Sequence, residues 1–244
     1  MSNKVEQTFF EDGFVVIRSA FKPADIEAIS NSLNQLKVTA KKFRTPTLHK
    51  NSYFVVEEER IHRIVWCCGE LPVLADYGRD PRITKYVAKI LGSKDFDHII
   101  CQSHYKTPGD NVAFDWHQDS QHRGYGTEKW QDLNNKGSFV QTLLAIDPMT
   151  MENGPIKFYK GSQKLQHLAL DKCTDPEKYF SRFELVHLTM EPGDLAFFHP
   201  YVIHGSSANH SNQERRVFIN GFSYPNANKF SYPGAGTGVR ISVS

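Results

Sequence analysis

Short apolar runs separated by turn residues occupy most of the chain from residue 98 onward. Runs of this kind, with β-branched or aromatic residues between Gly, Pro, Asn or Asp, are typical of β-strands. The predicted strands cover residues 98–105, 139–146, 155–159, 183–188, 194–198 and 216–222. Many short strands at this spacing favour a mainly β domain with two packed antiparallel sheets.

The N-terminal part of the chain has a different pattern, in which apolar residues recur at helical spacing. Pro23, a residue tolerated in the first turn of a helix, opens one such segment. Its apolar positions are Ile26, Ile29, Leu33 and Leu36. A second helical segment covers residues 71–91, restarts at Pro81 and ends at Gly92. Flanking helices are therefore expected to support the β core.

The remaining N-terminal segments are less regular. A short helix from residue 6, a turn at residues 12–13 and a strand at 14–17 are predicted before the first long helix. Residues 39–62 are polar and are predicted to be irregular, with residues 57–60 as a solvated segment.

One domain is predicted for residues 1–244, since the chain shows no internal repeat and no low-complexity linker. It divides into a helix-rich part (1–95), a β core (about 96–225) and a Gly-rich C-terminal loop or tail (226–244). The tail lies outside any strand–helix unit, so a loop or lid is expected there rather than a phosphate-binding turn.

Charge and cysteine usage limit the partners and the compartment. The formal net charge is +2 with basic residues scattered along the chain, so no nucleic-acid partner is expected. The four cysteines form no Cys-x-x-Cys pair, which favours free thiols in a reducing compartment. The sequence has no apolar signal segment and no stretch of membrane-spanning length. A cytoplasmic monomer or homodimer is expected.

His117-Gln118-Asp119 and the later His204 form a candidate metal-ligand set. Residues i and i+2 of a strand share a face, so His117 and Asp119 can reach one ion together. His204 follows an apolar strand and a turn, where a double-sheet domain would return a third ligand to the same mouth. Two His and one carboxylate are the facial triad of non-haem Fe(II) oxygenases. A His-x-Asp loop and a core histidine at position 204 are the structural alternatives.

Two arginines, Arg215 and Arg216, precede the last predicted strand. Side chains alternate along a strand, so only one of the two can face the interior. A buried guanidinium needs an anionic partner. A dicarboxylate such as 2-oxoglutarate would supply one, in a planar geometry that suits arginine.

Several short motifs, in order along nearly the whole chain, carry a resemblance to a known family. They are DGFVV (12–16), WHQD (116–119), AID (145–147), ENGP (152–155), GSQK (161–164), GD (193–194), HGS (204–206) and NHS (209–211) followed by Arg215. The chain resembles the phytanoyl-CoA dioxygenase family of Fe(II)/2-oxoglutarate-dependent oxygenases. Gln163 departs from the family's usual Gly-Ser-His, which affects local packing more than the metal set.

The resemblance implies a double-stranded β-helix core, the cupin-like jelly-roll, with helices packed on one sheet. It implies that His117, Asp119 and His204 bind Fe(II). At the family's spacing after the distal His, Arg215 would pair with the C5 carboxylate of 2-oxoglutarate. The expected further contacts to 2-oxoglutarate are Ser206, Gln102 and Thr142, although ordinary sheet polarity also explains the last two. The substrate-pocket candidates are His104, Lys106, Gln118, His122 and Arg123.

The reaction implied is hydroxylation of an unactivated C–H bond with consumption of O2 and release of succinate and CO2. A carboxylate at Asp119 argues against a halogenase, which needs a free coordination position for halide. His122 and Arg123 lie in a polar segment (120–137) that suits a loop over a polar or anionic small molecule, or else a solvated hairpin. A non-oxygenase metal-binding protein of cupin type and a catalytically silent binding protein are the alternatives.

Overall fold

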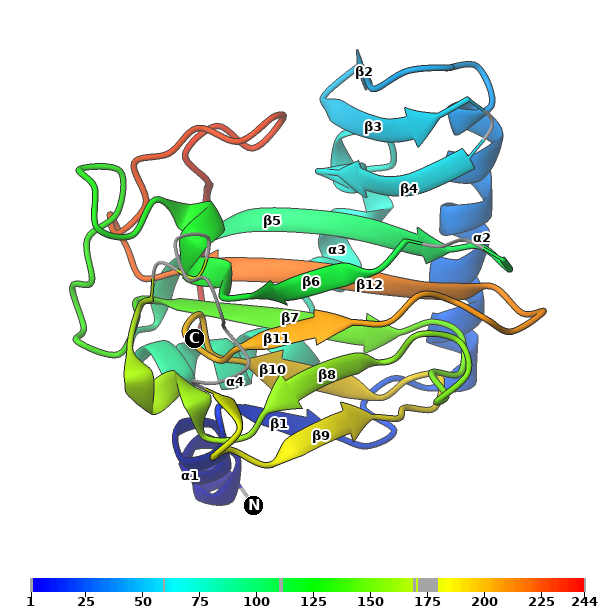
Figure 1. The fold of residues 1–244 in the computed structure, drawn as a ribbon. Helices are drawn as coiled ribbons and strands as arrows, with labels where there is room; N and C mark the ends of the chain where they lie inside the picture. The colour runs from blue at the N-terminus through cyan, green and yellow to red at the C-terminus, as the bar shows by residue number, and fades with distance from the viewer. Residues whose placement is uncertain (1, 59, 110–111, 169, 171–179, 244) are drawn as a thin grey trace.

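Two antiparallel sheets pack face to face in the computed structural model, which describes residues 2–58, 60–109, 112–168, 170 and 180–243 (Figure 1). The large sheet has the order β1 (Phe14–Ile17), β10 (Leu195–Phe198), β7 (Phe139–Ala145), β12 (Arg215–Ser223), β5 (Asp95–Lys106), β4 (Arg60–Val65), β3 (Ser52–Glu57) and β2 (Thr47–His49), with β13 (Val239–Ser242) also paired to β5. The small sheet has the order β6 (Phe114–His117), β11 (His204–Ser206), β8 (Ile156–Tyr159) and β9 (Leu185–Leu188). This is the expected mainly β jelly-roll core.

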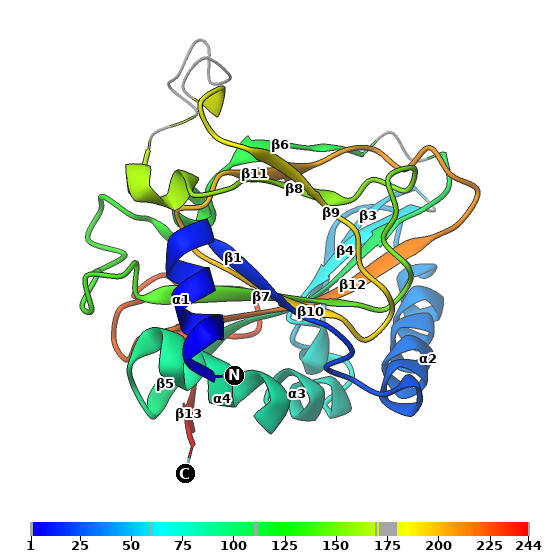
Figure 2. The same cartoon turned by 90° about the horizontal axis from the view of Figure 1, so that it is seen from below.

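Helices cover the face of the large sheet that points away from the small sheet (Figure 2). The α-helices are α1 (Ser2–Asp12), α2 (Pro23–Ala40), α3 (Val73–Gly78) and α4 (Pro81–Leu91), and the short 3-10 helices are η1 (Cys67–Gly69), η2 (Asp119–Arg123) and η3 (Ser162–Leu165). At the start of α4, the Asp80 carboxylate accepts a hydrogen bond from the Arg82 amide at 2.7 Å, and Gly92 ends the helix at φ +68°. The predicted helix positions are confirmed.

Because the large sheet is covered on both faces, its central strands β7 and β12 are buried along their whole length. All nine residues of β12 are buried. Phe218 and Phe222 pack in the core on the helix side, whereas Val217 and Ile219 pack in the core between the two sheets. Alternation along each strand therefore decides which side chains reach the space between the sheets.

The segment predicted to be irregular (39–62) instead contains β2, β3 and the first half of β4, so that prediction was wrong. Residues of β3 alternate between buried and half-buried, as on an amphipathic strand. The signal in β4 is masked because two polar residues in a row, His62 and Arg63, separate the buried Ile61 and Ile64. These strands extend the large sheet beyond β5 and add a wall to the space between the sheets.

None of the helices in the described part of the chain is both long and apolar enough to cross a membrane.

Candidate active site

A cavity of about 600 Å³ lies between the two sheets. Its apolar lining includes Phe114, Leu143, Phe198, Val217 and Ile219. Its polar lining includes Gln102, His104, His117, Asp119, His122, Arg123, Ser206 and Arg215, which are most of the residues predicted from the sequence. An apolar cavity with a few convergent polar groups is the usual form of a small-molecule site.

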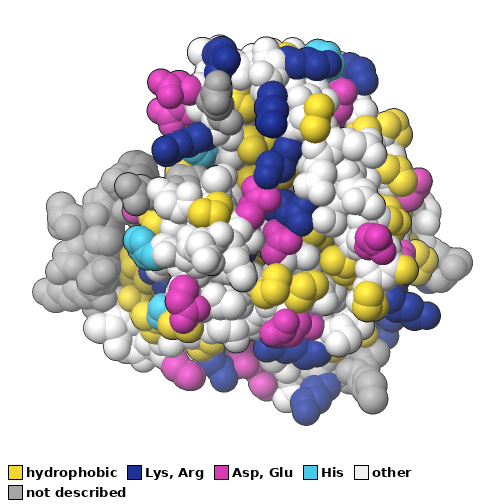
Figure 3. All heavy atoms as spheres, turned by 90° about the vertical axis from the view of Figure 1, so that its right-hand side faces the viewer, with side chains coloured by type: hydrophobic (Ala, Val, Ile, Leu, Met, Phe, Trp, Pro, Cys, Tyr) yellow, Lys and Arg dark blue, Asp and Glu magenta, His cyan; other side chains and the backbone are white. Residues whose placement is uncertain are grey.

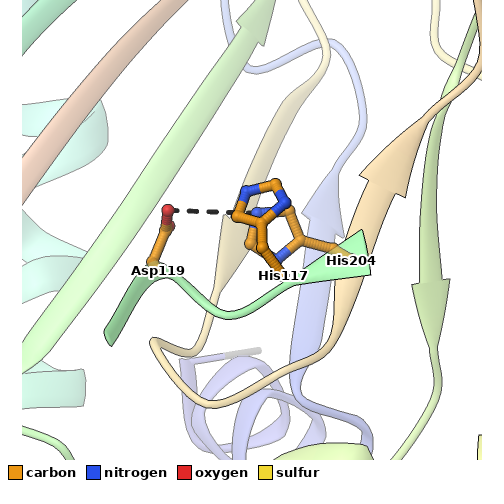
Figure 4. Close-up of side chains that lie close together, drawn as sticks. All are labelled: His117, Asp119 and His204. Atoms are coloured by element: carbon orange, nitrogen blue, oxygen red, sulfur yellow. Dashed lines mark ion pairs between the residues drawn. The ribbon is translucent and has the colours of Figure 1, made fainter. Parts of the chain in front are cut away.

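The side chains of His117, Asp119 and His204 converge on one point of this cavity (Figure 4). His117 ends β6 and His204 begins β11, and the two residues are paired across the small sheet. Asp119 begins η2 directly after β6. One ligand atom from each residue lies within 4.8 Å of the other two, and His204 Nε2 lies 3.9 Å from Asp119 Oδ1. These separations are close to those that one shared ion requires.

Hydrogen bonds to the backbone orient both imidazole rings. His117 Nδ1 lies 2.7 Å from the carbonyl oxygen of Asp115, and His204 Nδ1 lies 3.0 Å from that of Val202. A carbonyl oxygen only accepts, so each Nδ1 carries the proton and donates it. Each Nε2 is left with a free lone pair, the arrangement found in metal-ligating histidines.

Burial keeps His204 neutral. Loss of solvation, with a smaller effect from the neighbouring His117, lowers the pKa of His204 to about 4. A neutral imidazole is the form that binds a metal. The Asp119 carboxylate completes the set, and its buried Oδ2 has no hydrogen-bond partner among the described residues. Two imidazoles and one unsatisfied carboxylate oxygen fit a divalent iron ion.

Arg215 and Arg216 point to opposite faces of β12. Arg216 faces α2 and forms a bidentate pair with Asp147, at 2.8 Å from Nε and 2.7 Å from Nη2. Arg215 lines the cavity, where Nη2 donates to the Gly154 carbonyl at 2.9 Å and the buried Nε has no partner among the described residues. Burial lowers the pKa of Arg215 to about 10. A buried cation with no carboxylate partner fits an anionic co-substrate.

Ser206 lines the cavity, and Lys106 contacts it from behind. Lys106 Nζ donates to Ser206 Oγ at 2.8 Å and to the carbonyl oxygen of Ser207. Lys106 is buried and is not part of the cavity lining, so it supports Ser206. The long stem of Lys106 brings Nζ to Ser206 and to the loop after β11, and a substrate contact of Lys106 stays a prediction.

Gln118, another predicted substrate contact, points away from the cavity. The Gln118 amide donates to the carbonyl oxygens of Gln166 (2.8 Å) and Tyr201 (2.6 Å) and accepts from the Leu168 amide (2.7 Å). Gln118 therefore ties loops together and is not a substrate contact. The expectation that it belongs to the substrate pocket was wrong, since its neighbours on either side take the positions that face the cavity.

Thr142 was expected to contact 2-oxoglutarate, and this was wrong because of strand parity. On β7 the residues with odd numbers, such as Gln141 and Leu143, line the cavity. Thr142 lies on the helix side, where its hydroxyl donates to the Asn220 carbonyl at 3.0 Å.

Sequence reasoning missed several lining residues. They are Tyr53, Arg63, Gln141 and Tyr232. Tyr53 and Arg63 belong to the strands that were taken for an irregular segment, and Tyr232 belongs to the C-terminal tail. The one sequence signal was the Gly-rich character of the tail, which predicted a loop or lid and so indicated a place for Tyr232.

Comparisons with known proteins agree with this geometry. Residues 9–217 match the phytanoyl-CoA dioxygenase (PhyH) family. The peroxisomal phytanoyl-CoA dioxygenase of Bos taurus is 26% identical over 256 residues, covering 96% of this chain and 72% of that protein. EctD from S. alaskensis, solved with 2-oxoglutarate and 5-hydroxyectoine, superimposes with a TM-score of 0.72 at 18% identity, covering 93% of this chain and 77% of EctD. The epimerase SnoN, solved with Fe3+, alpha ketoglutarate and nogalamycin RO, gives 0.71 at 14% identity, covering 91% and 83%.

Proposed function

The chain belongs to the phytanoyl-CoA dioxygenase family and is a 2-oxoglutarate-dependent non-haem iron oxygenase, and from this premise we propose that it hydroxylates an unactivated C–H bond of a polar small molecule. The observation that carries this proposal is the pairing of two features in one cavity. One is the His117–Asp119–His204 set, and the other is the buried Arg215 guanidinium, which has no carboxylate partner in the described part of the chain.

Each site residue has a defined task in this reaction. The Nε2 atoms of His117 and His204 and the carboxylate of Asp119 would hold Fe(II) at the cavity. Arg215 and Ser206 hold the distal carboxylate of 2-oxoglutarate. When bound, Fe(II) and 2-oxoglutarate supply the oxidising chemistry, in which O2 is consumed, 2-oxoglutarate becomes succinate and CO2, and one oxygen atom enters the substrate.

The cavity walls determine where the substrate lies and how dry the site is. Aromatic and aliphatic side chains such as Phe114, Phe198 and Val217 exclude water around the candidate iron site. Asp119 fills the position that a halide would need, so transfer of oxygen is expected rather than of halogen. Among the structural neighbours is an epimerase, and the outcome on the substrate therefore has to be measured directly.

Turnover of 2-oxoglutarate tests the proposal. Purified protein is mixed with Fe(II), 2-oxoglutarate, O2 and a panel of polar small molecules, and succinate release is measured together with gain of labelled oxygen in the product. Coupled succinate release and oxygen insertion, both lost in Asp119→Ala, are expected. A protein that binds metal but consumes no 2-oxoglutarate would instead be a non-oxygenase metal protein of cupin type or a silent binding protein.

The cellular location and the absence of a nucleic-acid partner remain predictions. The bovine and human relatives are named as peroxisomal, so the predicted cytoplasmic location needs a localisation experiment. The predicted lack of a nucleic-acid partner needs a binding experiment; on the face seen in Figure 3, basic and acidic side chains are interspersed.

A further inference from the structure

Two guanidinium groups in the cavity have no counter-charge among the residues that the structure describes. Arg63 on β4 and Arg123 at the end of η2 both line the cavity, and the Nε of each is buried without a hydrogen-bond partner. Arg123 is 7% exposed, and Arg63 is half-buried. Neither forms an ion pair with a carboxylate in the described part of the chain. Burying an unpaired cation is unfavourable, so such a pair points to a missing anion.

The other charges of the proposed catalytic complex balance without Arg63 and Arg123. Fe(II) brings two positive charges and Arg215 one, while Asp119 brings one negative charge and 2-oxoglutarate two, so these four sum to zero. The remaining charged groups of the lining are Arg63, Arg123 and the exposed Asp115. The cavity therefore keeps an excess positive charge when it is loaded with iron and co-substrate.

The two arginines face the same space. Arg63 is paired across the sheet with His104, which also lines the cavity. The Arg123 guanidinium is held against two rings, 5.4 Å from the centre of Phe139 and 5.0 Å from that of Tyr232. Burial, and after it the positive charge of Arg123, lowers the pKa of Arg63, as expected for two cations that share one cavity.

A hydroxyl without a partner belongs to the same group. Tyr232 lines the cavity, and its buried hydroxyl oxygen has no hydrogen-bond partner among the described residues. Tyr53 also lines the cavity, and it lies on β3, the strand paired with the β4 strand that carries Arg63. We call Tyr53, Arg63, Arg123 and Tyr232 the arginine wall.

We infer that the substrate carries an anionic head group, a carboxylate or a phosphate, which Arg63 and Arg123 bind together and to which the Tyr232 hydroxyl donates. This inference rests on the proposed function, because it assigns the substrate class of that same cavity. Guanidinium groups bind both kinds of anion through paired N–H donors. The apolar lining then holds the rest of the molecule beside His117, Asp119 and His204.

Three probes with the same hydrocarbon chain test the head group: hexanoate, hexyl phosphate and the uncharged hexanamide. Binding is measured by calorimetry on protein loaded anaerobically with Fe(II) and saturating 2-oxoglutarate. At least one anion is expected to bind about tenfold more tightly than hexanamide, since charge-assisted hydrogen bonds are roughly twice as strong as neutral ones. The tighter of the two anions identifies the head group. Equal binding of all three probes would overturn the inference.

Matched variants connect the preference to the two side chains. Arg63→Gln and Arg123→Gln are each expected to weaken binding of the preferred anion by about tenfold and to leave hexanamide binding unchanged. Arg60→Gln removes a charge from an exposed position on the same strand and is expected to have no effect. An anion preference that survives in the double variant, with its fold intact by circular dichroism, would contradict the assignment.

The test also separates this inference from the proposed function. Binding of 2-oxoglutarate is recorded on the same samples, and it is expected to persist in Arg63→Gln and Arg123→Gln. If iron and 2-oxoglutarate fail to bind the parent protein, the proposed function fails. The probes are then compared in metal-free Arg215→Gln protein, where a preference for anions still supports binding by the arginine wall and its absence overturns it.

Discussion

The two walls of the cavity hold their polar side chains in different ways. On the iron wall (His117, Asp119, His204 and Arg215), both imidazoles and the guanidinium are each anchored by a hydrogen bond to a backbone carbonyl, while Asp119 Oδ2 and Arg215 Nε have no partner among the described residues. On the arginine wall, the Nε atoms of Arg63 and Arg123 and the hydroxyl of Tyr232 lack partners among the described residues.

This difference follows from what each wall binds. Iron and 2-oxoglutarate would be the same in every turnover, so side chains fixed in advance by the backbone reduce the entropy lost on binding. The arginine wall has buried polar groups without partners. The unfavourable free energy of burying them is offset only when a matching ligand binds. It consists mainly of segments outside the motifs that carry the family resemblance, which suits a region that selects the substrate.

Removing a ligand from the iron wall has the largest expected effect. His204→Ala is expected to lower Fe(II) affinity by more than about a hundredfold, because loss of outer-sphere partners alone already costs about 10–100-fold. Iron retention after desalting measures this. His122→Ala is the matched control, since His122 lines the cavity but lies outside the ligand set, and it is expected to retain iron. Equal iron loss in the two variants would mean that the ligands are misassigned.

The adjacent arginines of β12 give the next largest contrast. Arg215→Gln is expected to weaken 2-oxoglutarate binding by about a hundredfold or more, since loss of one partner of a buried charge pair costs about 2–5 kcal/mol. Arg216→Gln should instead lower the free energy of unfolding by roughly 3 kcal/mol, because it leaves the Asp147 carboxylate unpaired. Calorimetric binding and urea denaturation distinguish the two. The reverse pattern would show that the co-substrate has been assigned to the wrong face of β12.

Gln118→Ala tests whether the fixed character of the iron wall depends on loops behind it. Three backbone groups lose their partner, so a loss of roughly 3 kcal/mol in the free energy of unfolding is expected. Iron affinity should also fall, by about tenfold, as His117 and Asp119 lose their support. Relative binding of the hexanoate and hexanamide probes should not change. A changed probe preference would return Gln118 to the substrate pocket.

On the arginine wall, Tyr232→Phe is expected to weaken anion binding by roughly fivefold, the contribution of one neutral hydrogen bond of about 1 kcal/mol. Thermal stability should not fall, because the hydroxyl has no partner among the described residues and the ring against Arg123 remains. A drop in melting temperature without loss of anion affinity would show that the hydroxyl serves the fold.

The smallest effect is expected at Thr142. Thr142→Val removes a hydrogen bond to the Asn220 carbonyl on the helix side and should cost about 1 kcal/mol of stability. Affinity for 2-oxoglutarate should not change. Weakened 2-oxoglutarate binding, measured by calorimetry beside the parent protein, would place the residue back in the co-substrate site.

The iron wall could be predicted from the sequence because its residues lie in short motifs with fixed spacing. Parity along β12 permits only one inward arginine, and Arg215 is the one that lines the cavity. Parity along β7 could not be read in the same way, because polar and apolar residues occur on both covered faces, and Thr142 was assigned to the wrong one.

The arginine wall could not be predicted, with the exception of Arg123. Arg63 lies on a strand whose charged residues mask its alternation, and Tyr232 comes from a tail without regular pattern. Their approach to the iron wall depends on pairing between β4 and β5 and on the path of the C-terminal loop. Such tertiary contacts between distant segments leave no local signal in the sequence.

The most direct test is an anaerobic titration of 2-oxoglutarate into Fe(II)-loaded protein, followed by the weak visible metal-to-ligand charge-transfer band. The parent protein and Arg216→Gln are expected to develop the band with similar affinity, Arg215→Gln only at far higher 2-oxoglutarate concentration, and Asp119→Ala not at all. A parent protein that retains iron but develops no band, or a band with unchanged affinity in Arg215→Gln, would contradict a 2-oxoglutarate site formed by the iron wall.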